Sequence, residues 1–223
     1  MSGDKRGVGV RETLDQIGRR ADTDKSSKIH DYLNFYESFL HPLRDEPATV
    51  LEVGVFKGSS IRMWAEYFTR ATIIGADINL KRHTLGDHLA DRIKLVRVDQ
   101  GSAADLTGLG KAYGPFDVII DDGSHRWDHQ ILTVQTLLPF VKGGGFFIME
   151  DLHTSRPEDE AKYQGTSQRN TVDYLMALTR DVCLSASPGV MNGEQDPFLR
   201  SFMKELEFLV WRRSTLLMKR IKR

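Results

Sequence analysis

The sequence contains one cysteine, Cys183, and no excess of charge of either sign. A single cysteine excludes an intramolecular disulfide. Lysine and arginine together number 31, as do aspartate and glutamate, so no overall field favours nucleic acid or an anionic membrane. The apolar runs are far shorter than the roughly 20 residues of a membrane span, and no cationic, apolar leader is apparent. We therefore expect a cytoplasmic protein that binds neither nucleic acid nor membrane.

From residue 49 onward, short apolar runs alternate with segments of helical spacing. The apolar runs predict strands at residues 49–53, 72–76, 93–98, 116–120 and 145–149. Helices are expected between them, including 59–68 and 127–140, and beyond them at 171–179. Two β-rich runs, 205–211 and 215–221, predict an antiparallel hairpin at the sheet edge. The fold class is therefore α/β, with a doubly wound, mostly parallel seven-stranded sheet.

The segments before and after these strands differ in composition from them. Residues 1–20 are polar with some helical spacing, so a docked helix and a frayed arm are both open. Apolar residues at spacings of three and four predict one helix over 24–40. We divide the chain into an N-terminal helical arm, residues 1–45, and a main domain, residues 46–223. Within the main domain, the polar stretch 152–170 predicts a lid loop.

Glycines and polar residues surround the turn after the first expected strand. Glu52 precedes Gly54, and Gly58 and Ser59 open the next helix. Glycine allows the backbone to approach a ligand, and Ser59 or Ser60 can cap a helix whose N-terminus faces that ligand. A pair of glycines alone is weak evidence, and it does not match the three-glycine pattern of dinucleotide sites.

Acids also end the second and third expected strands. Asp77 follows the second strand, where a carboxylate can hold both hydroxyls of a ribose. Asp99 and Gln100 follow the third, where an adenine ring would lie. Any one of these acids is most simply a turn or capping residue. Three acids at three successive strand ends favour a nucleoside site.

The fourth and fifth strands end in paired acids, Asp121-Asp122 and Glu150-Asp151, and His125 follows the first pair. Parallel strands deliver such residues to one edge of the sheet, where open α/β sheets bind ligands. Hard oxygen ligands favour Mg²⁺, with Mn²⁺ as the alternative, over zinc. Neighbours on a strand point to opposite faces, so Asp121 fits a turn cap or a cofactor contact better than a metal ligand.

These motifs together resemble the class I S-adenosylmethionine-dependent methyltransferases, and more narrowly the metal-dependent O-methyltransferases that modify deoxysugars of antibiotics. The resemblance rests on Leu51-Glu52-Val53-Gly54, Gly75-Ala76-Asp77, Val98-Asp99-Gln100, Asp121-Asp122-Gly123-Ser124-His125 and Glu150-Asp151-Leu152-His153-Thr154-Ser155. Thr23-Asp24-Lys25-Ser26-Ser27, with Tyr32 and Tyr36, also fits that group, in which this segment covers the cofactor. Ser26 stands where glycine is expected.

The resemblance implies S-adenosylmethionine as the methyl donor and Mg²⁺ held by Asp122, Glu150 and Asp151. It assigns the general base to His125, and a neutral imidazole suits that role near neutral pH. The acceptor would be a sugar hydroxyl of a small-molecule glycoside, and the protein could form a homo-oligomer. The expected cofactor contacts are Glu52, Gly54, Gly58, Ser59, Asp77, Asp99, Gln100, Asp121 and Tyr32. The expected substrate contacts are Trp127 and His153.

Three alternatives remain open from the residues. A catechol-type O-methyltransferase also chelates adjacent hydroxyls with a metal, but commonly uses a lysine as base. A nicotinamide-dependent oxidoreductase is disfavoured because the three-glycine motif is absent. A non-catalytic S-adenosylmethionine-binding protein would not need the acids together with His125. His129, four residues after His125, could mimic a zinc pair, but no helical glutamate accompanies it, and we interpret it as a helix-surface residue.

Overall fold

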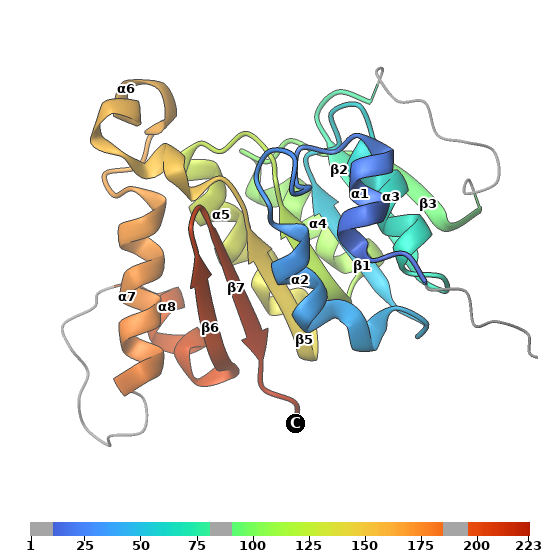
Figure 1. Cartoon of the computed structure of the whole chain (residues 1–223). Helices are drawn as coiled ribbons and strands as arrows, with labels where there is room; N and C mark the ends of the chain where they lie inside the picture. Colours follow the sequence, from blue (N-terminus) through green and yellow to red (C-terminus); the bar gives the residue numbers. More distant parts are fainter. Residues whose placement is uncertain (1–10, 81–90, 185–195) are drawn as a thin grey trace, which may run out of the picture.

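The computed structural model describes residues 11–80, 91–184 and 196–223. Its centre is a seven-stranded sheet in the order β3-β2-β1-β4-β5-β7-β6 (Figure 1). Five adjacent strands, β3 to β5 in that order, pair in parallel, and β7 pairs antiparallel with both β5 and β6. This confirms the predicted fold class and the terminal hairpin. The strands are β1 (Thr49–Val53), β2 (Thr72–Asp77), β3 (Ile93–Arg97), β4 (Phe116–Asp121), β5 (Val141–Met149), β6 (Leu206–Arg212) and β7 (Thr215–Arg220).

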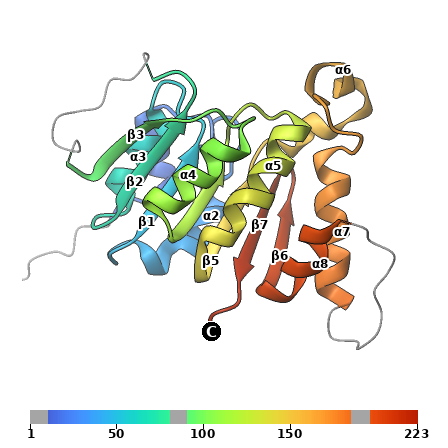
Figure 2. The same cartoon turned by 180° about the vertical axis from the view of Figure 1, so that it is seen from behind.

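Helices cover both faces of the sheet. One face carries α1 (Leu14–Ala21), α2 (Leu33–Leu40) and α3 (Ser59–Tyr67), seen in front in Figure 1. The opposite face carries α4 (Ala103–Tyr113), α5 (Trp127–Leu137), α7 (Thr171–Leu184) and α8 (Pro197–Phe202), and Figure 2 shows α4 and α5 from that side. Among the described residues, no helix combines the length and hydropathy that a membrane span requires.

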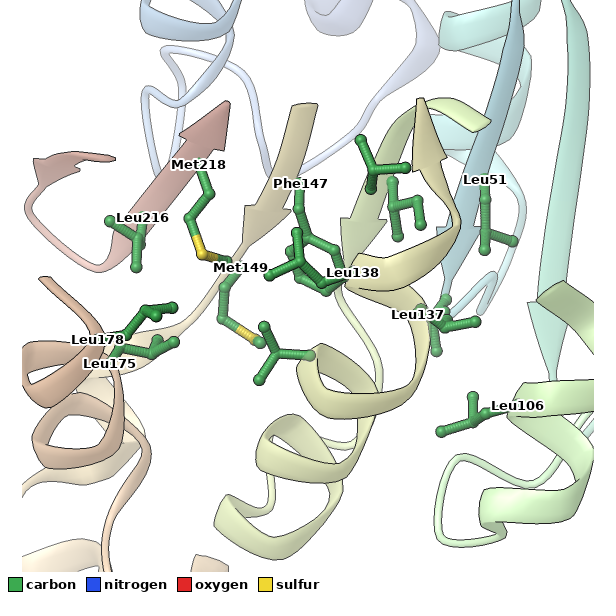
Figure 3. Packing of buried hydrophobic residues seen from close by; sticks show 14 of the residues in the cluster. Leu51, Leu106, Leu137, Leu138, Phe147, Met149, Leu175, Leu178, Leu216 and Met218 are labelled. Atoms are coloured by element: carbon green, nitrogen blue, oxygen red, sulfur yellow. The ribbon is translucent and has the colours of Figure 1, made fainter. Parts of the chain in front are cut away.

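Each buried strand contributes to two separate hydrophobic clusters because successive side chains point to opposite faces. Ile120 and Ile148 pack with α1, α2 and α3. Ile119 and Phe147 pack with α4, α5 and α7, in the cluster drawn in Figure 3. The central strands are therefore apolar without interruption, which is why their positions could be predicted from composition alone.

The N-terminal arm differs from its prediction. The expected helix over 24–40 is wrong, because helix begins only at Leu33. The preceding residues form turns that place Lys25 and Ser26 inside the protein. The amides of Tyr32 and Leu33 donate to the carbonyl oxygen of Lys25, and Asp31 has φ 55°, so the chain reverses there. Helix α1 shows that residues 14–21 form a docked helix, whereas residues 1–10 lie outside the described part.

One smaller expectation is also corrected. Helix α3 has Gly58 at its N-cap, with φ 79° and no side-chain cap, so neither Ser59 nor Ser60 caps it. Ser60 instead donates to Glu52. The stretch 152–170 contains short helical turns, η4 (Leu152–Ser155), η5 (Pro157–Asp159) and α6 (Glu160–Tyr163), and its role as a lid stays a prediction. The sequence also predicts a loop through Gly193 after the helix at 171–179, and this segment lies outside the described residues.

Replacement of Phe147 by alanine tests the core between the sheet and α5. Phe147 is fully buried, so the substitution should lower the free energy of unfolding by about 3–5 kcal/mol. Met176 on α7 is 50% exposed and provides the control, because M176A should change stability by less than about 0.5 kcal/mol. Urea denaturation followed by circular dichroism measures both. Equal effects of the two substitutions would contradict the assigned core.

Candidate cofactor and metal site

A cavity of about 330 Å³ lies at the carboxyl ends of β1, β2 and β3 and beside the turn after β4. Four of the residues predicted to contact the cofactor line it: Gly54, Asp77, Asp99 and Gln100. Asp122, predicted as a metal ligand, lines it as well. The structure thus brings the strand ends together as expected for a parallel sheet.

The wall of this cavity at the end of β1 requires glycine at position 54. Gly54 has φ 94°, and its amide donates to the carbonyl oxygen of Ala76. A Cβ atom there would clash with the backbone carbonyl of Asp122. The amide of Asp122 also donates to the carbonyl oxygen of Val53, so the ends of β1 and β4 are in direct contact. Only glycine combines this dihedral angle with such close approach.

Asp77 organises the turn that follows β1. Its Oδ2 accepts hydrogen bonds from the amides of Val55 and Phe56, at 2.8 and 3.1 Å, and its Oδ1 accepts from Asn79. The carboxylate therefore both shapes the loop and faces the cavity. Its predicted contact with a ribose stays a prediction.

Five predicted cofactor residues lie outside the cavity lining: Glu52, Gly58, Ser59, Asp121 and Tyr32. Asp121 is fully buried and accepts from Gln100 and from the amide of Gly123, and burial raises its pKa to about 7. It supports the turn after β4, and its predicted contact with the cofactor stays a prediction. Tyr32 donates to Asp151 rather than facing the cavity.

His129 and Ser124 were not predicted to contact the cofactor, although both line the cavity. His129 was interpreted as a surface residue of a helix. It is half-buried instead, and its Nδ1 lies 2.8 Å from the hydroxyl oxygen of Ser124. Its position one turn into α5, beside the turn after β4, explains the difference. The sequence alone does not show how close α5 lies to the residues that follow β3.

Asp122, His125 and Asp151 form a group that could hold a metal ion. One potential ligand atom of each lies within 4.8 Å of the others. The Nε2 atom of His125 is 3.5 Å from Oδ2 of Asp151, and all three side chains are partly open to solvent. The group forms because β4 and β5 are neighbours, with the amide of Glu150 donating to the carbonyl oxygen of Asp121.

Glu150, the third predicted metal ligand, lies beside this group but is buried. Its Oε1 accepts from the hydroxyl of Tyr36 at 3.0 Å, and its Oε2 accepts from the ammonium of Lys25 at 2.6 Å. Burial raises the pKa of Glu150 well above its usual value, although Lys25 opposes that shift. Both of its oxygens have donors in this arrangement, so its role as a ligand stays a prediction.

Lys25 is the main residue that the sequence interpretation missed. Its side chain is 1% exposed, and its ammonium contacts Asp122, Glu150 and Glu52, the last at 3.3 Å. Burial lowers the pKa of Lys25, but the charges of the three carboxylates outweigh burial and raise the pKa well above its usual value. Lys25 lies in the segment 23–27 of the family resemblance. No pattern in the sequence indicated its contacts with Asp122 and Glu150, which are more than 90 residues away along the chain.

The two predicted substrate contacts have different environments. Trp127 is buried, and its indole nitrogen donates to the carbonyl oxygen of Thr154 at 2.8 Å. It therefore ties α5 to the turn η4. His153 is exposed, and its Nδ1 lies 3.9 Å from Oδ1 of Asp151, at the open side of the acidic group. Of the two, His153 is the one placed where an acceptor could reach it.

Comparison with known proteins agrees with this geometry. The chain is 38% identical over 158 residues to the 8-demethyl-8-alpha-L-rhamnosyl tetracenomycin-C 2'-O-methyltransferase of Streptomyces olivaceus, covering 67% of the chain and 40% of that protein. It is 36% identical over 157 residues to the mycinamicin VI 2''-O-methyltransferase of Micromonospora griseorubida, covering 67% of the chain and 38% of that protein. No family model matches the sequence.

A solved structure extends the likeness to nearly the whole chain. MycE methyltransferase, in complex with Mg, SAH and mycinamycin VI, superposes with a TM-score of 0.76 at 25% identity, covering 96% of this chain and 56% of MycE. The chain has the class I methyltransferase fold and is related to antibiotic-sugar O-methyltransferases. It spans about two fifths of the length of the curated relatives it matches.

The residues of this chain fit a divalent cation and an adenosine-containing cofactor. Oxygen ligands on Asp122 and Asp151 are of the kind that Mg²⁺ prefers. Glu52, Asp122 and Glu150 lie around one ammonium, and Asp151 lies beside His125, so the cluster carries more negative than positive charge when these acids are ionised. The adjacent cavity is lined in part by Asp77 and Asp99, whose carboxylates can accept hydrogen bonds from hydroxyl groups.

Substitution of Gly54 tests the close approach of the strand ends. G54A should weaken S-adenosylhomocysteine binding and lower the free energy of unfolding, because the new methyl group meets the carbonyl of Asp122. Gly108 in α4 has no heavy atom near its added Cβ, so G108A should retain binding and gain about 0.5–1 kcal/mol of stability. Calorimetry and thermal unfolding measure both quantities. Unchanged binding by G54A would contradict the assigned cavity wall.

Proposed function

We propose that the chain is the catalytic part of an O-methyltransferase that uses S-adenosylmethionine and Mg²⁺ to methylate a sugar hydroxyl of a glycosylated natural product. One observation carries the proposal. Asp122 both lines the cavity at the ends of β1 to β3 and belongs to the group with His125 and Asp151. A methyl donor in the cavity and a cation held by the two aspartates of that group would therefore share one residue.

The relatives support the choice of acceptor class. Their names describe methylation of a rhamnosyl group of tetracenomycin C and of mycinamicin VI. MycE was solved with Mg and SAH. The corresponding acceptor of this chain would be a small-molecule glycoside with adjacent hydroxyl groups, which suit chelation by one cation.

In this mechanism, Asp122 and Asp151, with Glu150 behind them, would hold the cation. When bound, Mg²⁺ would lower the pKa of the hydroxyl and orient it. His125 would accept the hydroxyl proton at Nε2, and Asp151, 3.5 Å away, would stabilise the imidazolium that forms. The acceptor oxygen would then bond to the methyl carbon as the carbon–sulfur bond breaks, which would convert the sulfonium of S-adenosylmethionine into the uncharged sulfide of S-adenosylhomocysteine. Alignment of these groups would supply much of the acceleration.

The catechol-type alternative uses a lysine as base. It is disfavoured by the environment of Lys25, the lysine that contacts the acids of this site. Lys25 is buried among three carboxylates, which hold its pKa well above the usual value after opposing the effect of burial. It therefore keeps its proton near neutral pH. His125, which is partly exposed beside Asp151, is the better base.

The proposal extends to two segments. The arm, residues 1–45, would act as a cover, and the contacts of Tyr32 with Asp151 and of Tyr36 with Glu150 support this. Residues 152–170 would act as the lid, anchored at Thr154 by Trp127. A cytoplasmic location, a homo-oligomeric state and the absence of nucleic-acid binding remain predictions.

Metal removal tests the proposed reaction. EDTA treatment should abolish methyl transfer to mycinamicin VI or to a rhamnosyl tetracenomycin, and Mg²⁺ should restore it, since the cation would activate the hydroxyl. Methyl transfer is measured by mass spectrometry, and S-adenosylhomocysteine binding by calorimetry in parallel. Full turnover by metal-free protein, or binding of NADH in place of S-adenosylhomocysteine, would reject the proposal.

Replacement of His125 by alanine tests the base. At saturating Mg²⁺, H125A should lower kcat by about 10²–10⁴, the usual contribution of a positioned base, while S-adenosylhomocysteine affinity stays unchanged. His41, in the turn after α2, is exposed and gives the matched control H41A, which should keep full activity. If H125A turns over at the wild-type rate, His153 becomes the next candidate.

A further inference from the structure

The ammonium of Lys25 is shared among acids from three different strands. Glu52 belongs to β1, Asp122 follows β4, and Glu150 follows β5. An ammonium has three N–H donors, and here three separate carboxylates surround it. No part of the proposed reaction uses this lysine, although it contacts two of the residues expected to hold the cation.

Lys25 leaves the group that could hold a metal ion, Asp122, His125 and Asp151, partly open to solvent. Lys25 contacts Asp122 through Oδ2 from the buried side, whereas Asp122, His125 and Asp151 face one another on the partly exposed side. The residues that could hold a divalent ion are therefore more exposed than the lysine. The buried charge of Glu52 and Glu150 would be costly without a cationic partner.

The same segment carries further donors to these acids. The hydroxyl of Tyr32 donates to Asp151 at 2.9 Å, and that of Tyr36 donates to Glu150. The backbone carbonyl of Lys25 accepts from the amides of Tyr32 and Leu33, at 2.9 and 3.3 Å. The hydrogen bonds that dock residues 25–36 and those that hold the acids in place therefore form one connected network.

We propose that Lys25 is a positioning residue: it holds Asp122 and Glu150 against Glu52 so that the acidic site is assembled before a divalent ion binds, with residues 25–36 docked over it. The inference rests on the metal dependence of the proposed function. Without the ammonium, the buried carboxylates would turn apart, and ion binding would require them to be brought together again. Residues that orient metal ligands typically contribute about 10- to 100-fold to affinity.

The test compares Lys25→Met with Lys28→Met by titration with Mn²⁺, followed by electron paramagnetic resonance of the free ion. Lys28 is exposed on the same segment and, among the described residues, donates to the backbone of Arg19 alone, so K28M is the matched control. K25M should bind Mn²⁺ about 10- to 100-fold more weakly than wild type. K28M should match wild type, and S-adenosylhomocysteine affinity should be retained in both. Equal or tighter Mn²⁺ binding by K25M would overturn the inference.

A second measurement uses the unaltered protein, in case K25M does not fold. Hydrogen exchange of the Tyr32 and Leu33 amides should slow when Mn²⁺ is added, because the ion fixes the acids that anchor this segment. Unchanged or faster exchange would overturn the inference. If wild-type protein binds no Mn²⁺, the proposed function fails as well, whereas equal binding by wild type and K25M rejects only the role of Lys25.

Discussion

The site depends on one buried cation. Lys25 reaches the sheet from the N-terminal arm and meets carboxylates that end three adjacent strands. Such a cluster is costly to bury, and the loss of either partner would leave an uncompensated charge. The arm, the order of the strands and the orientation of the acids therefore have to form together.

The order of the strands explains why these acids are neighbours. β4 lies between β1 and β5, and in this register Val53 is opposite Asp121, which is opposite Met149. The next residues along the chain, Gly54, Asp122 and Glu150, therefore emerge side by side at one edge. Gly54 provides the space, Asp122 faces both the cavity and the open acidic group, and Glu150 turns inward. Three adjacent strand ends thus place a cavity beside a group of residues that could hold a cation.

Much of this could be predicted from residues alone. The strand positions were correct to within about one residue, except that β5 begins at Val141 rather than at 145, because central parallel strands are apolar on both faces. Asp122 and Asp151 were placed together because parallel strands end at one edge. The helix over 24–40 was predicted wrongly, since its apolar spacing is also satisfied by turns that bury Lys25 and Ser26. The sequence predicts His129 on a helix surface because nothing local indicates its contact with Ser124 in the turn after β4.

The sequence by itself determined the sheet, its terminal hairpin and the set of acids at its edge, because each depends on local periodicity and on the ends of strands. Tertiary structure alone decided which acids stay open to a metal and which are buried. That choice depends on Lys25, which is 97 residues from Asp122 and 125 from Glu150. A contact across such separations is set by strand order and by docking of the arm, and neither leaves a periodic signal in the chain.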